Sequence, residues 1–180
     1  MTAMAKTPSK PRTAPKAAPS KTQGPAPPQR IFLVVVDETK EMRVALHFAA
    51  LRARHTGGRV ALLCVIAPSD MGLSGAVEDL ERQEARASAE ELLAKLSAEV
   101  KEISGSLPVV YIRDGHARDA LLALIAEEPS ISVLVLVAGA GAEGPGPLIS
   151  ALVGKMAGSI RVPITIVPGS LSDAQLAALA

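Results

Sequence analysis

An apolar run passes into a glycine-rich segment at Ser132-Val-Leu-Val-Leu-Val-Ala-Gly-Ala-Gly-Ala-Glu-Gly-Pro-Gly146 of this 180-residue chain, and this passage is its clearest indication of fold class. Residues 132–138 form an apolar, β-branched-rich run that is too short to cross a membrane, which predicts a strand buried on both faces of a parallel sheet. Four glycines follow within residues 139–146. Open α/β sheets bind ligands in the crevice beyond the carboxyl ends of their strands, so we expect a glycine-lined crevice here.

Three glycines in and beyond this stretch have a regular spacing. Gly141, Gly144 and Gly154 follow the pattern Gly-x2-Gly-x9-Gly, and Lys155 comes next. Glycine lets the backbone approach a ligand closely, and the first N–H groups of a following helix attract phosphate oxygens. The spacing therefore favours a nucleotide phosphate site. A turn that only connects a strand to a helix is the alternative interpretation of the same glycines.

Two better-known phosphate motifs do not fit these residues. A Walker A loop would need a glycine at Ile149, five residues before Gly154. Residues 139–144 also spell Gly-x-Gly-x-x-Gly, but Pro145 and Pro147 stand where a dinucleotide-binding fold would begin its first helix. Neither pattern predicts the site.

The composition is that of one ordinary domain with an aliphatic core. Hydrophobic residues make up 48% of the chain and aromatic residues only 2%, so the core must consist of Val, Leu, Ile and Ala. The single cysteine, Cys64, cannot form an intramolecular disulfide, and nothing else requires an oxidising compartment. The first thirty residues lack the apolar segment of a secretory signal. The sequence therefore predicts a cytoplasmic protein.

Residues 1–29 differ in composition from the rest of the chain. They contain seven of the 14 prolines and no Leu, Ile, Val or aromatic residue. Residues 1–30 carry six basic side chains and no acid, which leaves 19 − 6 = 13 basic and 18 acidic residues, or −5, for the remainder. We expect a disordered basic tail that is either a simple extension or an electrostatic arm for nucleic acid or another anionic surface.

Beyond the tail, apolar runs alternate with helical patterns. The apolar runs predict strands over residues 30–37, 60–66, 107–113, 132–138 and 163–167. Apolar stripes at helical spacing predict helices that end near residue 55, cover about 76–103, begin near 117 and cover 172–180. This alternation predicts an α/β fold, a doubly wound five-stranded parallel sheet with helices on both faces. The domains are then the tail over 1–29, the sheet domain over 30–168 and a short C-terminal helix over 169–180.

Few side chains are candidates for chemistry. Asp37 ends the first strand and would face the crevice, although it or Thr39 could simply cap the next helix. His116 follows a glycine at a strand end, where a lone histidine is more often a cap or a surface group. No nucleophile, base and orienting group come together, and no metal-ligand spacing is present. We therefore expect a protein that is not an enzyme and binds no metal.

Residues 30–168, about three quarters of the chain, resemble a single universal stress protein domain. The resemblance is carried by Val34-Val-Val-Asp37, Ala61-Leu-Leu-Cys-Val65, Asp114-Gly-His-Ala117, the glycine motif and Val162-Pro-Ile-Thr-Ile-Val167. It implies an adenine nucleotide alpha hydrolase-like, five-stranded fold and a homodimer. It also implies an adenine nucleotide, ATP or AMP, as ligand.

The resemblance also implies positions for the nucleotide. Asp37 and a backbone group of Val65 would lie near the nucleoside. Gly141 and Gly144 would line the phosphates, faced by the backbone N–H groups of Gly154, Lys155 and Met156. The chain departs from the family pattern at Lys155, where the family has Ser or Thr, and at Glu143, which adds a negative charge inside the loop.

Two functions follow from the resemblance. The first is a cytoplasmic stress-response regulator that senses an adenine nucleotide. The alternative is a nucleotide-free dimeric scaffold that acts through protein contacts. In either case the fifth strand, with Ile164 and Ile166, would pair across a two-fold axis, and Leu176 would cover that edge or cross to the partner.

Overall fold

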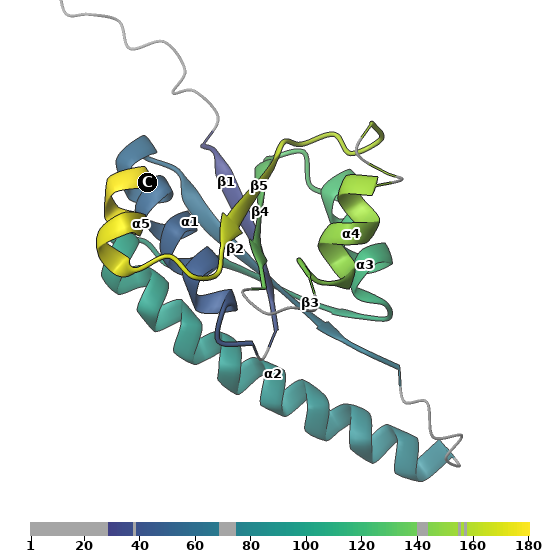
Figure 1. Ribbon diagram of the computed structural model, residues 1–180. Coiled ribbons are helices and arrows are strands. Elements are labelled where there is room, and N and C mark those ends of the chain that lie inside the picture. Colours follow the sequence, from purple (N-terminus) through teal and green to yellow (C-terminus); the bar gives the residue numbers. More distant parts are fainter. Residues whose placement is uncertain (1–28, 38, 69–74, 140–143, 155, 157) are drawn as a thin grey trace, which may run out of the picture.

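The structure is a computed structural model, and it describes residues 29–37, 39–68, 75–139, 144–154, 156 and 158–180. Within these residues, five strands alternate with five helices (Figure 1). The elements are β1 (Ile31–Val36), α1 (Met42–Thr56), β2 (Arg59–Ile66), α2 (Gly75–Ser104), β3 (Val109–Asp114), α3 (Ala117–Glu127), β4 (Ile131–Ala138), α4 (Pro147–Gly154), β5 (Ile164–Pro168) and α5 (Asp173–Leu179). Each sequence-predicted strand is present, with bounds that differ by at most two residues.

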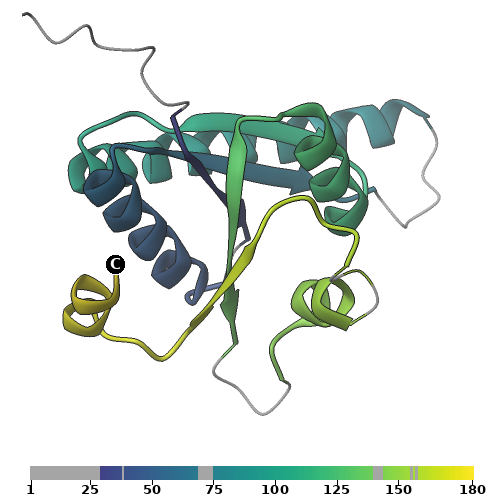
Figure 2. The same ribbon diagram turned by 90° about the horizontal axis from the view of Figure 1, so that it is seen from above.

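All five strands are parallel and lie in the order β3-β2-β1-β4-β5. Helices α1, α2 and α5 cover one face of the sheet, and α3 and α4 cover the other (Figures 1 and 2). The predicted doubly wound α/β fold is therefore confirmed. Strand β1 lies at the centre because its run of aliphatic residues can be buried on both faces.

Successive side chains of each strand point to opposite faces, and this alternation divides the core in two. Val34 and Val36 pack against α1 and α2, whereas Leu33 packs against α3 and α4. The predicted stripe of α1 is buried as expected, and Gly57 ends that helix with φ at 67°. Helix α2 is longer than the sheet requires, so its first half, from Gly75 to Ser88, is mostly exposed and extends beyond the domain (Figure 1).

Helix α5 is part of the core of its own chain, so of the two placements expected for Leu176 the structure supports the one within the chain and not the crossing to a partner. Its N-terminus carries a complete capping box, in which the Ser172 hydroxyl and the Gln175 side chain each bond the other residue's backbone N–H. Leu176 is only 1% exposed and packs in the cluster that contains Val167 and the apolar face of α1. It therefore cannot supply a dimer interface, because its own chain already buries it.

One arginine, Arg161, binds the connection between α3 and β4 from its position just before β5. The Arg161 guanidinium donates to four backbone carbonyls, those of Ile125 at 2.8 Å, Glu128 at 3.1 Å, and Pro129 and Ile131 at 3.4 Å each. These carbonyls belong to the end of α3, the following turn and the start of β4. Such charge-assisted bonds satisfy carbonyls that the helix leaves without intrahelical donors.

Among the described helices, none is both long and apolar enough to span a bilayer.

Candidate functional site

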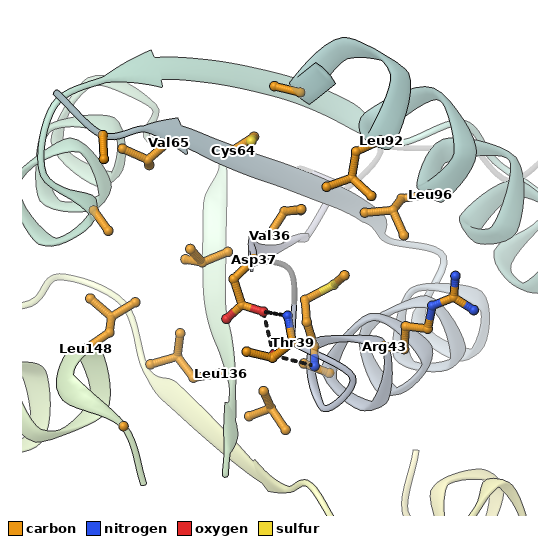
Figure 3. Close-up of a pocket in the computed structure, with 18 of the residues that line it drawn as sticks. Val36, Asp37, Thr39, Arg43, Cys64, Val65, Leu92, Leu96, Leu136 and Leu148 are labelled. Carbon is orange, nitrogen blue, oxygen red and sulfur yellow. Dashed lines mark hydrogen bonds between the residues drawn. The ribbon is translucent and has the colours of Figure 1, made fainter. Parts of the chain in front are cut away.

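A cavity of about 1000 Å³ opens at the carboxyl ends of β1, β2 and β4 (Figure 3). Chain connections leave β1 and β4 toward opposite faces of the sheet, so this is the topological switch point of the fold. Open α/β sheets bind their ligands at such points. The crevice expected from the sequence is therefore present, and its volume suits a ligand of nucleotide size or larger.

The cavity continues over both faces of the sheet edge. On the side of α4, its walls come from side chains that pack with α3 and α4 and from the starts of these two helices: Val35, Val65, Leu136, Ala117, Leu148 and Ile149. On the side of α2, the walls come from strand side chains that pack with α1 and α2 and from these two helices: Val36, Met42, Ala45, Cys64, Ala85, Ser88, Ala89, Leu92 and Leu96. We call these the α4 side and the α2 side. In Figure 3, Leu148 and Leu136 lie on one side of Asp37, and Leu92, Leu96 and Arg43 lie on the other.

Asp37 lies between the two sides, directly after β1. Its Oδ1 accepts hydrogen bonds from the backbone N–H of Thr39, at 2.9 Å, and from the Thr39 hydroxyl. That hydroxyl in turn accepts a bond from the N–H of Met42 at 3.2 Å. Thr39 therefore caps the start of α1, and Asp37 holds Thr39 in place. One oxygen of the exposed carboxylate serves this turn, and Oδ2 has no hydrogen-bond partner among the described residues.

The α4 side brings a helix N-terminus to the cavity. Gly144 and Gly146, both with positive φ at 87° and 94°, lead into α4, and Pro145 to Ile149 line the wall. Pro147 has no N–H, and the Ser150 N–H donates to the Gly146 carbonyl at 3.1 Å. Helix geometry leaves the N–H groups of Leu148 and Ile149 without intrahelical acceptors, and such groups attract anions.

Two residues of the predicted phosphate site stand apart from the described lining of the cavity. Gly154 is the last residue of α4, is exposed, and is not among the residues that line the cavity. Met156 follows it and does not line the cavity either. These two backbone N–H groups lie at and beyond the end of α4, whereas the start of that helix, at Pro147, lines the cavity. Gly141 and Lys155 lie outside the described residues.

Of the other positions considered from the sequence, Val65 lines the cavity and His116 does not. Val65 lines the α4 side near the end of β2. His116, the residue before α3, is exposed, makes no side-chain cap bond and does not line the cavity. Nothing in the sequence singles out Arg43, the other charged side chain of the described lining. Its position in the first turn of a predicted helix does not distinguish it from ordinary surface arginines.

The cavity has the chemistry of a binding site. Its described walls are mostly aliphatic, with a few polar groups, chiefly Asp37, Thr39, Arg43, Cys64 and Ser88. Within the described part of the chain, no three His, Cys, Asp or Glu side chains gather as they would around a metal ion. Apolar walls with a few fixed polar groups are typical of sites that hold small organic ligands.

The model of the universal stress protein family matches residues 29–168 of this chain. The curated proteins compared with the chain yield no match. Among solved structures, the universal stress protein UspA from Lactobacillus plantarum aligns with a TM-score of 0.66 at 18% identity, over 79% of this chain and 99% of that protein.

Two further solved structures hold ligands named in their descriptions. A universal stress protein in complex with cAMP aligns with a TM-score of 0.54 at 16% identity, over 79% of this chain and 98% of that one. A universal stress protein from Archaeoglobus fulgidus in complex with dAMP aligns with a TM-score of 0.53 at 16% identity, over 77% and 96%. At these identities the likeness concerns the fold. The family match, which covers more than half of the sequence, shows that the chain belongs to the universal stress protein family.

Proposed function

We propose that this chain binds an adenine nucleotide of the AMP type in the α4 side of the cavity and acts as a ligand-sensing regulator. The observation that carries the proposal is the meeting of Asp37 and the α4 N-terminus at one switch-point cavity. A carboxylate suits the hydroxyls of a ribose, and free helix N–H groups suit a phosphate. The cAMP and dAMP complexes of two family members support this ligand class.

Each part of the nucleotide has a counterpart on the α4 side. Val65 and Leu136 present aliphatic surface for the base beside the end of the sheet. The Asp37 Oδ2 can accept a bond from a ribose hydroxyl while Oδ1 keeps its bonds to Thr39. The phosphate would lie against Leu148 and Ile149, whose N–H groups replace those expected at Gly154 to Met156.

Calorimetric titration with AMP, ATP and adenosine tests this proposal. Asp37→Asn keeps an oxygen for Thr39 but replaces the second carboxylate oxygen with an N–H donor. We expect AMP affinity to fall about tenfold, which corresponds to about 1.4 kcal/mol, at unchanged melting temperature. Asp79→Asn is the matched control, because Asp79 is exposed on α2 and does not line the cavity. Absence of AMP binding to the wild type, or equal loss in both variants, contradicts the proposal.

A nucleotide-free dimeric scaffold is the second candidate function, and the free edge of the sheet favours it. Strand β5 is the last of the sheet, and Ile166 on it is 39% exposed. The Leu134 N–H donates to the Pro163 carbonyl, and the Gly169 N–H donates to the Ala138 carbonyl. In a parallel ladder, odd-numbered residues of β5 therefore bond β4, and the N–H groups of Ile164 and Ile166 point outward. An unpaired strand edge of this kind can pair with a second copy.

Sedimentation and native mass spectrometry of the purified chain separate the two candidates. A dimer that carries AMP-type nucleotide supports the sensor, whereas a dimer free of nucleotide that also fails to bind added AMP supports the scaffold. We further propose that the protein works in the cytoplasm and catalyses no reaction. Incubation with ATP and detection of ADP or AMP would reveal an activity and contradict the second statement.

The basic tail over residues 1–29 lies almost wholly outside the described residues, and its role stays a proposal. We propose that any contact with nucleic acid resides there, because phosphate contacts need only Lys and Arg. Deletion of the tail should abolish salt-sensitive DNA binding. DNA binding that persists in the truncated chain would assign the contact to the folded domain.

A further inference from the structure

The α2 side of the cavity is left without a ligand by the proposed function. Asp37, Val65 and the α4 N-terminus all place the nucleotide over the other face of the sheet edge. Yet the α2 side is open enough that Leu92 and Cys64 remain half-exposed between helices and sheet. Inside a cavity of about 1000 Å³, an apolar ligand that covers partly exposed aliphatic side chains removes their surface from water, and this burial favours binding of the ligand.

The charge on this side has one sign. Arg43 lies on this side with Leu92 and Leu96 (Figure 3), whereas Asp37, the other charged residue of the described lining, lies between the two sides. Arg43 makes no hydrogen bond or ion pair through its side chain within the described part of the protein. It stands in the first turn of α1, and no other residue of that turn is acidic and could pair with it. An anion from outside the chain could therefore pair with the Arg43 guanidinium.

We propose that the α2 side of the cavity binds an apolar carboxylic acid, of the class of medium-chain fatty acids, as a second ligand. The carboxylate pairs with the Arg43 guanidinium, whose planar fork matches two carboxylate oxygens. The hydrocarbon chain lies between α1 and α2, against Met42, Leu92 and Leu96. Ala85 and Ala89 leave the room that this chain needs, because larger residues at these positions of α2 would fill it.

This ligand differs from the nucleotide in what holds it. The nucleotide is held by hydrogen bonds from the sheet edge and α4, whereas the acid is held by one ion pair and by burial of its chain. Each CH₂ moved from water into the cavity should raise the affinity about fourfold until the cavity is full. The two ligands occupy opposite faces of the sheet edge, so both can be present at once.

Titration of the full chain with acetate, hexanoate, octanoate and decanoate tests the proposal. We expect weak or no binding of acetate and a stepwise gain in affinity with chain length. Arg43→Gln should weaken octanoate binding at least about tenfold while leaving the binding of the neutral analogue 1-octanol unchanged. Arg86→Gln is the control, because Arg86 is exposed on α2 outside the cavity.

A second pair of variants tests where the chain lies. Ala85→Phe fills the α2 side and should weaken both octanoate and octanol, whereas Ala87→Phe, on the same helix outside the cavity, should change neither. Ala85 and Ala87 are both exposed, so both variants should fold. Equal effects of the two phenylalanines, or of the two Arg→Gln changes, would overturn the assignment. Displacement of octanoate by AMP would overturn it as well, whereas failure of AMP to bind would leave the octanoate results intact and count against the nucleotide alone.

Discussion

Replacement of Leu176 by Ala tests whether α5 belongs to the core of this protein. Leu176 is 1% exposed, and the change removes three buried carbon groups. At about 0.8 kcal/mol for each, the lost transfer free energy is about 2.4 kcal/mol. The cavity that remains adds to this, but α5 is a short helix at the end of the described chain and can move inward. We therefore expect the free energy of unfolding to fall by about 3 kcal/mol, in the lower part of the range for buried leucines.

Urea denaturation followed by circular dichroism measures this change, and Leu179→Ala is the matched control. Leu179 lies one turn from Leu176 on the same helix but is 61% exposed, so its replacement should cost less than about 0.5 kcal/mol. In a chain of this size the Leu176 variant should melt roughly 6 to 12 °C below wild type. Equal effects of the two variants would refute the docking of α5. Dissociation of a dimer by Leu176→Ala without loss of stability would restore the leucine to an interface between copies.

Three further predictions concern other parts of the fold. Arg161→Met removes the guanidinium donor from four carbonyls, of which that of Glu128 keeps its bond from the Ile131 N–H, and it should lower the free energy of unfolding by about 2 kcal/mol in urea titration. A change below about 0.5 kcal/mol would mean that water replaces the guanidinium at no cost. Ile166→Lys places a charge on the exposed edge of β5 and should convert a dimer into a monomer in sedimentation while the melting temperature of the monomer stays unchanged. Gly154→Ala should stabilise α4 by about 0.5 kcal/mol and leave AMP affinity unchanged in calorimetry. Gly144→Ala, at a φ of 87°, should weaken AMP binding. Weaker AMP binding by the Gly154 variant, with no change in the Gly144 variant, would return Gly154 to the phosphate site.

Local periodicity determined the order of the elements. The run over residues 132–138 has no polar face, so it could be stable only as a central strand, and β4 is buried as that run predicts. The stripe on α1 and the glycine at its end likewise specified a helix packed on a sheet. Asp37 could be placed at the crevice because strand ends in a parallel sheet share one edge. These inferences use only neighbours along the chain and the direction of parallel strands.

The sequence predicts a short helical segment after Gly146 but does not specify its first residue. Gly144 and Gly154 both fit a glycine pattern, and Pro147 is compatible with the first turn of a helix as well as with a loop. The structure begins the helix at Pro147 and so turns the N–H groups of Leu148 toward the cavity instead of those after Gly154. The choice depends on packing of Ile149 and Leu152 against α3 and the sheet. Contacts between distant segments determine where α4 begins, and such contacts cannot be read from the spacing of residues along the chain.

Tertiary structure alone also decided which residues share a cavity. Arg43 lies on α1 and Ala85 on the exposed half of α2, and in the sequence each looks like an ordinary helical surface residue. The long helix α2 brings its middle across the ends of β1 and β2, which places both residues on one wall. Leu176 became a core residue in the same way, when α5 folded back on α1. The strands, the helices and their order along the chain follow from periodicity, which is local and can be read from neighbouring residues. The sites depend on contacts between distant segments, so only the folded chain defines them.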